Sequence, residues 1–233
     1  MTEPKFATAL IVGAGAGLSA SLARALAKDG IKVALAARTT DDLHELAVEA
    51  KAETFACDAS KRAEVEKLFA NLDATVGAPD IVIYNASYRT RGPFGDLDPD
   101  EVEKALAVTA FGAFLVAQQA VKRMLPNAHG VILFTGASAG VKGYAQSAPF
   151  AMGKFALRGL SQSMARELHP QGIHVAHVVI DGGIKSARRA EPPDKPDSLL
   201  DPDAIAASYL HIIHQPRSAW ATEIELRPWV ERF

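Results

Sequence analysis

The sequence is poor in cysteine, in net charge and in long apolar runs. Its 233 residues hold one cysteine, Cys57, which excludes an internal disulfide and a metal site built from several thiolates, and no metal is expected. A net charge of −2 gives none of the basic field that nucleic acids or anionic lipids require. No run approaches the roughly 20 apolar residues of a membrane span, and the N-terminus lacks the basic and apolar regions of a secretion signal. We therefore expect a cytoplasmic protein whose partners are neither nucleic acid nor membrane.

What the sequence does contain is a regular alternation of two patterns. Short apolar, β-branched runs bounded by Gly, Asp or Pro predict buried strands, and stretches with apolar residues at helical spacing separate them. The runs are residues 7–13, 31–37, 53–57, 80–86, 130–136 and 172–180. Strands that alternate with helices form a parallel sheet covered on both faces. The chain is therefore predicted to be one doubly wound, Rossmann-like α/β domain over residues 1–233.

A proline-rich segment interrupts this alternation just after the sixth run. It spans residues 191–203, with the sequence "EPPDKPDSLLDPD". Irregular segments of this length are uncommon in compact domains and often carry function. We expect a mobile substrate loop over about residues 185–203.

A glycine-rich turn connects the first strand to the first helix. Gly13, Gly15 and Gly17 remove side chains at this turn, just before Leu18 begins the helix. A pyrophosphate can then approach the backbone and rest on the helix N-terminus, where free N–H groups and the helix dipole favour an anion. Taken alone, such a turn is also compatible with a tight connection that binds nothing.

The end of the second strand favours one dinucleotide over the other. An acidic residue at this place hydrogen-bonds the ribose 2′-hydroxyl of NAD and repels a 2′-phosphate. The chain instead has Ala37 followed by Arg38. NADP is therefore the expected cofactor, and NAD is less favoured.

Together, these motifs resemble the short-chain dehydrogenase/reductase family over nearly the whole chain, as far as a seventh strand at residues 220–226. Val12 and Ser19 depart from that family's glycine signature, whereas Gly13 and Gly17 match it. The resemblance implies a dinucleotide site that also includes Asp58 and Ala59 near the adenine, Asn85 and Ala86 after the fourth strand, and Gly182, Ile184 and Ser186 beside the nicotinamide.

The catalytic positions of that family are largely changed in this chain. The resemblance implies an Asn, a Ser and a Tyr where the sequence has Thr109, Ala137 and Phe150, and of the usual set only Lys154 remains. Residues i and i+4 share a helix face, so Phe150 and Lys154 are expected to point into one pocket. There Lys154 is expected to hold the nicotinamide ribose, a role that needs no tyrosine.

The missing tyrosine hydroxyl leaves the source of the proton open. A hydride added to a carbonyl creates an alkoxide, which an acid must neutralise. Three sources of the proton are compatible with the sequence. Ser138, Tyr144 or Tyr88 could provide another hydroxyl, or a water held by Lys154 could deliver the proton. Alternatively, the acceptor is an activated alkene that takes its proton later from solvent. Tyr88 and Tyr144 are equally compatible with half-exposed loop aromatics.

The leading hypothesis is an NADP(H)-dependent oxidoreductase that transfers hydride to a carbonyl or activated alkene with a non-standard catalytic set. The alternative is an NADP-binding sensor or structural protein with little turnover. Four arginines on two loops at the open end of the site, Arg89, Arg91, Arg188 and Arg189, suit an anionic small-molecule substrate. Solvated loop charge explains the same residues without a ligand.

The helical pattern over residues 100–125 is apolar on more than one face. Ala107, Val108, Phe111 and Leu115 lie away from its main apolar stripe, so the sheet alone is not expected to cover them. In proteins that the chain resembles, this helix and the one carrying Lys154 form a four-helix contact between subunits. A homodimer or homotetramer is therefore expected.

Overall fold

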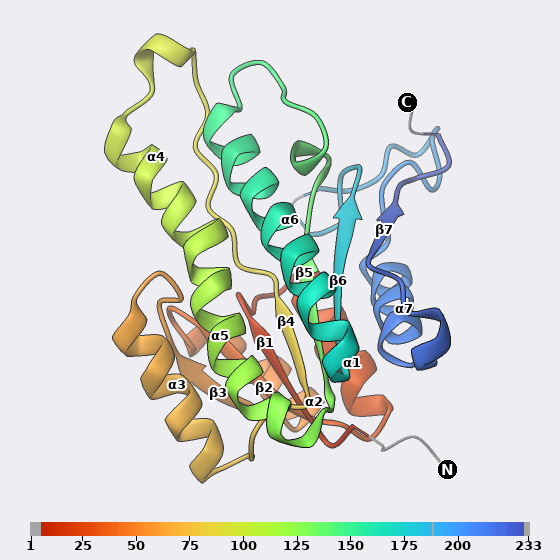
Figure 1. Ribbon diagram of the computed structural model, residues 1–233. Helices are drawn as coiled ribbons and strands as arrows, with labels where there is room; N and C mark the ends of the chain where they lie inside the picture. The colour runs from red at the N-terminus through yellow and green to blue at the C-terminus, as the bar shows by residue number, and fades with distance from the viewer. Residues whose placement is uncertain (1–5, 188, 231–233) are drawn as a thin grey trace.

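The computed structural model describes residues 6–187 and 189–230 of the chain. Within this part, parallel strands form one sheet in the order β3-β2-β1-β4-β5-β6-β7, which confirms the predicted doubly wound α/β class (Figure 1). The strands are β1 (Thr8–Val12), β2 (Lys32–Ala37), β3 (Glu53–Ala56), β4 (Ile81–Tyr84), β5 (Gly130–Thr135), β6 (Ile173–Ile180) and β7 (Glu223–Leu226). The order reverses between β1 and β4, which places the ligand crevice of such folds outside the carboxyl ends of these two strands.

Helices cover both faces of the sheet and make two separate cores. They are α1 (Leu18–Lys28), α2 (His44–Ala50), α3 (Arg62–Ala74), α4 (Pro99–Leu106), α5 (Gly112–Met124), α6 (Ala148–Leu168) and α7 (Pro202–Ile213). On one face α1, α2 and α7 pack on the sheet, and on the other α3, α5 and α6 do so. Because both faces are covered, the central strands are apolar throughout instead of alternating.

Helix starts are set by local chemistry that is visible in the sequence. The Asp98 side chain accepts a hydrogen bond from the Asp100 N–H at the start of α4, and a proline follows it at the first helical position. Asp201 does the same for α7, again with a proline after it. An acidic N-cap followed by proline satisfies free N–H groups and fixes the backbone for the first turn. The helix α1 has no such cap, because Gly17 stands at its N-cap position.

A π-helical segment, Ala107–Phe111, joins α4 to α5 where the sequence predicts one uninterrupted helix. The hydroxyl of buried Tyr84 donates to the Val108 carbonyl in this segment. Gly112 lets the helix approach this closely, since a Cβ there would lie 2.8 Å from the Ala59 carbonyl oxygen. Such π turns are frequent at functional sites, and this one sets the position of Thr109.

The combined helix at residues 99–127 has the length and hydropathy of a membrane-spanning helix, but 44% of its most apolar window is buried inside the protein. Burial against the sheet accounts for part of that composition. One expectation about its outer face is wrong: Leu115 is only 4% exposed and belongs to the core. Phe111, on the same expected face, is 45% exposed.

The loop after β6 folds back on itself before α7 begins. Ile184 and Leu200 form a bridge, the Leu200 N–H donates to the Gly183 carbonyl, and the Lys185 N–H donates to the Leu200 carbonyl. Leu200 is buried in the core at the base of this loop. The expected substrate loop is therefore anchored at both ends, and its mobility stays a prediction.

Candidate active site

The glycine turn after β1 has the shape of a phosphate cradle. Gly13 has φ +85°, and a Cβ there would lie 2.4 Å from the Ala86 nitrogen, so only glycine fits. Around Gly15 and Gly17 no atom lies within 4 Å of where a side chain would begin. This open space faces a helix N-terminus without a side-chain cap. The turn therefore fits a pyrophosphate, whose oxygens would accept hydrogen bonds from the free N–H groups.

The turn is held from behind by two polar side chains. Ser19 donates to the Gly13 carbonyl over 3.2 Å, and the Asn85 amide donates to the same carbonyl over 3.3 Å. Ser19, which departs from the family glycine signature, thus supports the turn instead of disrupting it. Asn85 links the turn to the end of β4.

A groove of about 610 Å³ runs along the carboxyl ends of β1, β2 and β4. The predicted cofactor residues that line it are Gly13, Gly15, Arg38, Asp58, Ala59, Asn85 and Ala86. Burial works to raise the pKa of Asp58, but hydrogen bonds from Ser60 and the charges of Lys61 and Arg38 bring it below its usual value. Asp58 is therefore held as a carboxylate at the end of the groove where Arg38 lies.

A second cleft, of about 380 Å³, adjoins the groove and shares Asn85 and Ser87 with it. Leu18, Gly182 and Ile184 line this cleft, so the structure brings them beside the catalytic candidates. Ser186 does not line it, and its backbone instead pairs with Arg189. Arg188 lies outside the described residues.

Lys154 lies at the inner wall of this cleft and is only 3% exposed. Its ammonium donates to the Thr135 carbonyl over 2.7 Å, and no described carboxylate forms an ion pair with it. Burial, together with the positive charge of Arg89, lowers the pKa of Lys154 to about 7. The amine can therefore gain or lose a proton near neutral pH.

Phe150 lies on the same face of α6, as the spacing predicts, with its ring centroid 5.7 Å from the Lys154 nitrogen. The ring is 6% exposed, and the Arg89 guanidinium lies over it, 4.0 Å from its centroid. Nothing in the linear spacing indicates this contact, since it joins a loop after β4 to a distant helix.

The other catalytic candidates separate into two groups. Ser138 and Tyr144 line the cleft, with Tyr144 on the loop before α6 and 45% exposed. Thr109 does not reach the cleft: it is 1% exposed, its hydroxyl accepts the Tyr88 N–H, and it packs against Gly153. The Tyr88 hydroxyl donates to Glu101 on α4. Thr109 and Tyr88 thus hold structural contacts outside the cleft, and a catalytic role for either stays a prediction.

Comparison with known proteins identifies a family match that includes the groove and the second cleft. Residues 7–196 match the family model described as short chain dehydrogenase. The chain belongs to the short-chain dehydrogenase family. An uncharacterised oxidoreductase of Staphylococcus aureus is 28% identical over 226 residues, which cover 94% of this chain and 96% of that protein. A short chain aldehyde dehydrogenase of Euphorbia lathyris is 29% identical over 86% of this chain and 70% of its own length.

Solved short-chain dehydrogenase structures share the fold over nearly the full chain. A short-chain dehydrogenase from Rhodopseudomonas palustris is 31% identical and superposes with a TM-score of 0.83, covering 97% of this chain and all of that one. A metagenomic short-chain oxidoreductase in complex with NADP is 26% identical with a TM-score of 0.84, covering 96% and 98%. The family to which this chain belongs is therefore one of oxidoreductases of the short-chain dehydrogenase type.

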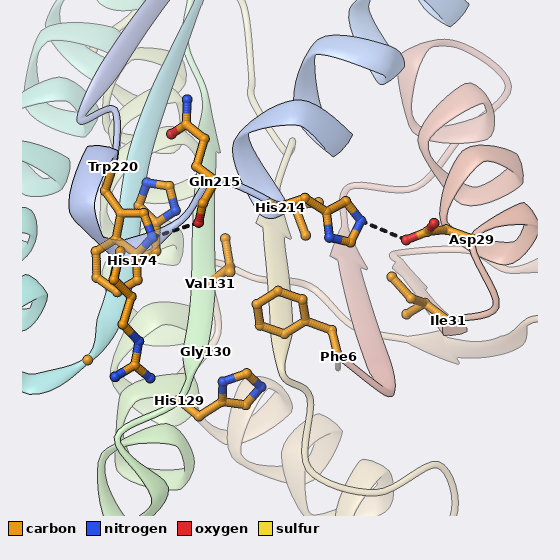
Figure 2. A pocket seen from close by; sticks show the side chains of 13 residues that line it. Phe6, Asp29, Ile31, His129, Gly130, Val131, His174, His214, Gln215 and Trp220 are labelled. Carbon is orange, nitrogen blue, oxygen red and sulfur yellow. Dashed lines mark hydrogen bonds and ion pairs between the residues drawn. The ribbon is translucent and has the colours of Figure 1, made fainter. Parts of the chain in front are cut away.

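A further cavity, of about 420 Å³, lies at the other end of the strands, by the amino ends of β1, β5 and β6 (Figure 2). Its walls carry Phe6 stacked on His129 and Trp220 stacked on His174, each pair with centroids 4.7 Å apart. His214 closes one side through a 2.7 Å contact with Asp29. None of the predicted site residues lines the cavity, so it is separate from the groove and from the second cleft.

Proposed function

We propose that the protein is an NADP(H)-dependent reductase that transfers hydride to a carbonyl or activated alkene with a non-standard catalytic set. The observation that carries this proposal is the junction of groove and cleft, where an open glycine cradle leads directly to the buried amine of Lys154. The NADP complex of the metagenomic relative supports the choice of cofactor.

Different residues of the groove and the cleft would contact different parts of the cofactor. Gly15 and the N-terminus of α1 would hold the pyrophosphate, and Arg38 would hold the 2′-phosphate. Lys154 would hold the nicotinamide ribose, and Gly182 and Ile184 the carboxamide. NADPH, when bound, supplies the hydride; the chain binds and orients it at the cleft.

The acceptor is reduced without the hydroxyl that Phe150 lacks. Ser138 and Tyr144, the two predicted hydroxyl donors that line the cleft, would serve in its place. Lys154, with its pKa near 7, can also keep a water molecule poised to give up a proton. These groups suit an acceptor whose developing negative oxygen is stabilised first and protonated afterwards.

Arg38 provides the direct test of the cofactor assignment. We expect NADPH to bind at least about 10-fold tighter than NADH, because a charge-assisted phosphate contact is worth ~1.5 to 3 kcal/mol. Arg38→Asp should reverse this preference. Fluorescence titration of both cofactors with both proteins measures it, and equal affinities in the unaltered protein would contradict the proposal.

The alternative function is an NADP-binding sensor or structural protein, and the replacement of three catalytic side chains favours it. NADPH oxidation assayed across aldehydes, ketones, quinones and enoyl thioesters separates the two. Tight NADPH binding without oxidation by any acceptor class would select the binding protein. Turnover that is lost in Lys154→Ala would select the reductase.

A further inference from the structure

The second cleft, in which the acceptor is proposed to bind, is called the acceptor cleft. It is lined by four cationic side chains and, among the described residues, by no acidic one. Arg89 and Arg91 come from the loop after β4, Arg189 from the loop after β6, and Lys154 from α6. None of the three arginines forms an ion pair with another described side chain. Like charges gathered around one concavity without counter-ions raise the local concentration of anions.

Arg89 is exposed at the rim of the cleft, but its guanidinium packs on an aromatic ring. Its guanidinium lies 4.0 Å from the centroid of the Phe150 ring, which is itself almost fully buried. Burial and the charges of Arg91 and Arg189 lower the pKa of Arg89. These charges are therefore close enough to repel one another, and an anion between them relieves that repulsion.

Arg189 is held on a second loop. Its backbone makes two hydrogen bonds of 3.0 Å with Ser186. The side chain lies over Gly183, where a Cβ would come within 2.9 Å of the Arg189 Nη1. Because residue 183 is a glycine, no side chain there displaces the Arg189 guanidinium from the wall of the cleft.

We infer that Arg89 and Arg189 form an anion-binding subsite that holds a carboxylate or phosphate of the acceptor, with the Phe150 ring as the support for Arg89. Guanidinium groups bind both anions through paired, charge-assisted hydrogen bonds. The inference rests on the proposed function for the identity of the ligand as an acceptor. It gives Phe150 a role of its own, since the ring at the tyrosine position positions a cation.

Anion binding at equilibrium tests the subsite without any turnover. Oxalate, inorganic phosphate and oxamide, the neutral counterpart of oxalate, are titrated by calorimetry into protein saturated with NADP⁺, which keeps phosphate out of the cofactor groove. We expect an anion to bind and oxamide not to bind. Arg89→Gln and Arg189→Gln should each weaken anion binding by about 10-fold or more, because each removes a charge-assisted contact.

Two further variants separate a local effect from a general one. Phe150→Leu should weaken anion binding nearly as much as Arg89→Gln, whereas Phe150→Tyr, which keeps an aromatic face, should retain it within about 3-fold. Arg24→Gln is the matched control, since Arg24 pairs with Glu49 on the surface outside the cleft and should leave binding unchanged. Preference for oxalate assigns a carboxylate ligand, and preference for phosphate assigns a phosphate.

The inference is overturned if the protein binds neither anion, or binds one equally well after Arg89→Gln. NADP⁺ affinity is measured in every variant. Intact NADP⁺ binding without an anion site rejects the subsite alone. Failure of the unaltered protein to bind NADP⁺ rejects the proposed function, and the anion titrations are then judged on the protein without cofactor.

Discussion

Lys154 keeps an amine inside the protein, where water cannot solvate its charge. Its one hydrogen bond goes to a neutral backbone carbonyl, so no opposite charge offsets the loss of hydration. Burial and Arg89 bring its pKa from 10.5 to about 7. Below pH 7 the buried amine is charged in the folded state, and its lost hydration lowers the free energy of unfolding by the largest amount. Between about 7 and 10.5 it releases a proton that the unfolded chain retains, so this group makes the fold more stable as pH rises.

Lys154→Met should therefore remove a pH-dependent penalty. We expect the variant's gain in unfolding free energy to be largest at pH 6 and to shrink above pH 7 by up to about 1.4 kcal/mol per pH unit, the slope for one proton. Urea unfolding of both proteins at pH 6, 8 and 9.5 measures the difference. The same difference at all three pH values would show that Lys154 does not titrate in this range.

At the scale of helices, α5 and α6 lie side by side on one face of the molecule (Figure 1). The outer surfaces of these helices and of the π-helical segment before α5 carry large apolar side chains that the fold leaves uncovered: Phe111 at 45%, Phe114 at 41%, Met152 at 48% and Phe155 at 45% exposed. Phe111 and Phe114 stack on each other with centroids 6.2 Å apart. Apolar side chains gathered in this way mark a surface for another chain.

We predict that a second copy of the chain covers this surface. Light scattering should give a mass at least twice 24.7 kDa at micromolar concentration. The double variant Phe114→Glu/Phe155→Glu should give a monomer, because two buried carboxylates at the contact would be strongly unfavourable. Val48→Glu, at an exposed position on α2, is the matched control and should leave the mass unchanged. A monomeric unaltered protein would contradict this prediction.

The elements themselves were predictable, whereas parts of the site were not. Buried strands such as β5 and β6 are apolar runs with clear ends, so local pattern is enough to find them. The roles of Thr109 and Phe150 depend on tertiary contacts. A π turn and Gly153 bury Thr109 behind the cleft, and Arg89 reaches Phe150 from another loop. Spacing within one helix placed Phe150 and Lys154 together correctly, but it carries no information about either contact.

At the scale of the whole molecule, the cofactor groove joins segments that are far apart in the chain. The ends of β1, β2 and β4 meet there, and the cleft beside it adds α6 and the loop after β6. A ligand that contacts all of them binds the folded state alone and so stabilises the entire fold.

NADPH should accordingly raise the melting temperature. At 100 times its dissociation constant a ligand adds about 2.7 kcal/mol, which corresponds to roughly 5–10 °C for a chain of this size. Gly15→Asp places a carboxylate in the open cradle without a steric clash. Calorimetry should therefore find the variant as stable as the parent without cofactor and unresponsive to NADPH. If NADPH still raised the melting temperature of the variant, the cofactor phosphates would have to bind somewhere other than this turn.

The paired backbone between Ile184 and Leu200 also bears on how this protein can diverge. These two residues close the base of the loop by pairing with each other, and lengthening a closed loop adds little to its entropic cost. The segment they enclose supplies Arg189 to the cleft, yet its sequence is free of the constraints of the core. If the cleft binds the acceptor as proposed, exchanging this segment would change which acceptor is preferred and leave the rest of the fold unchanged.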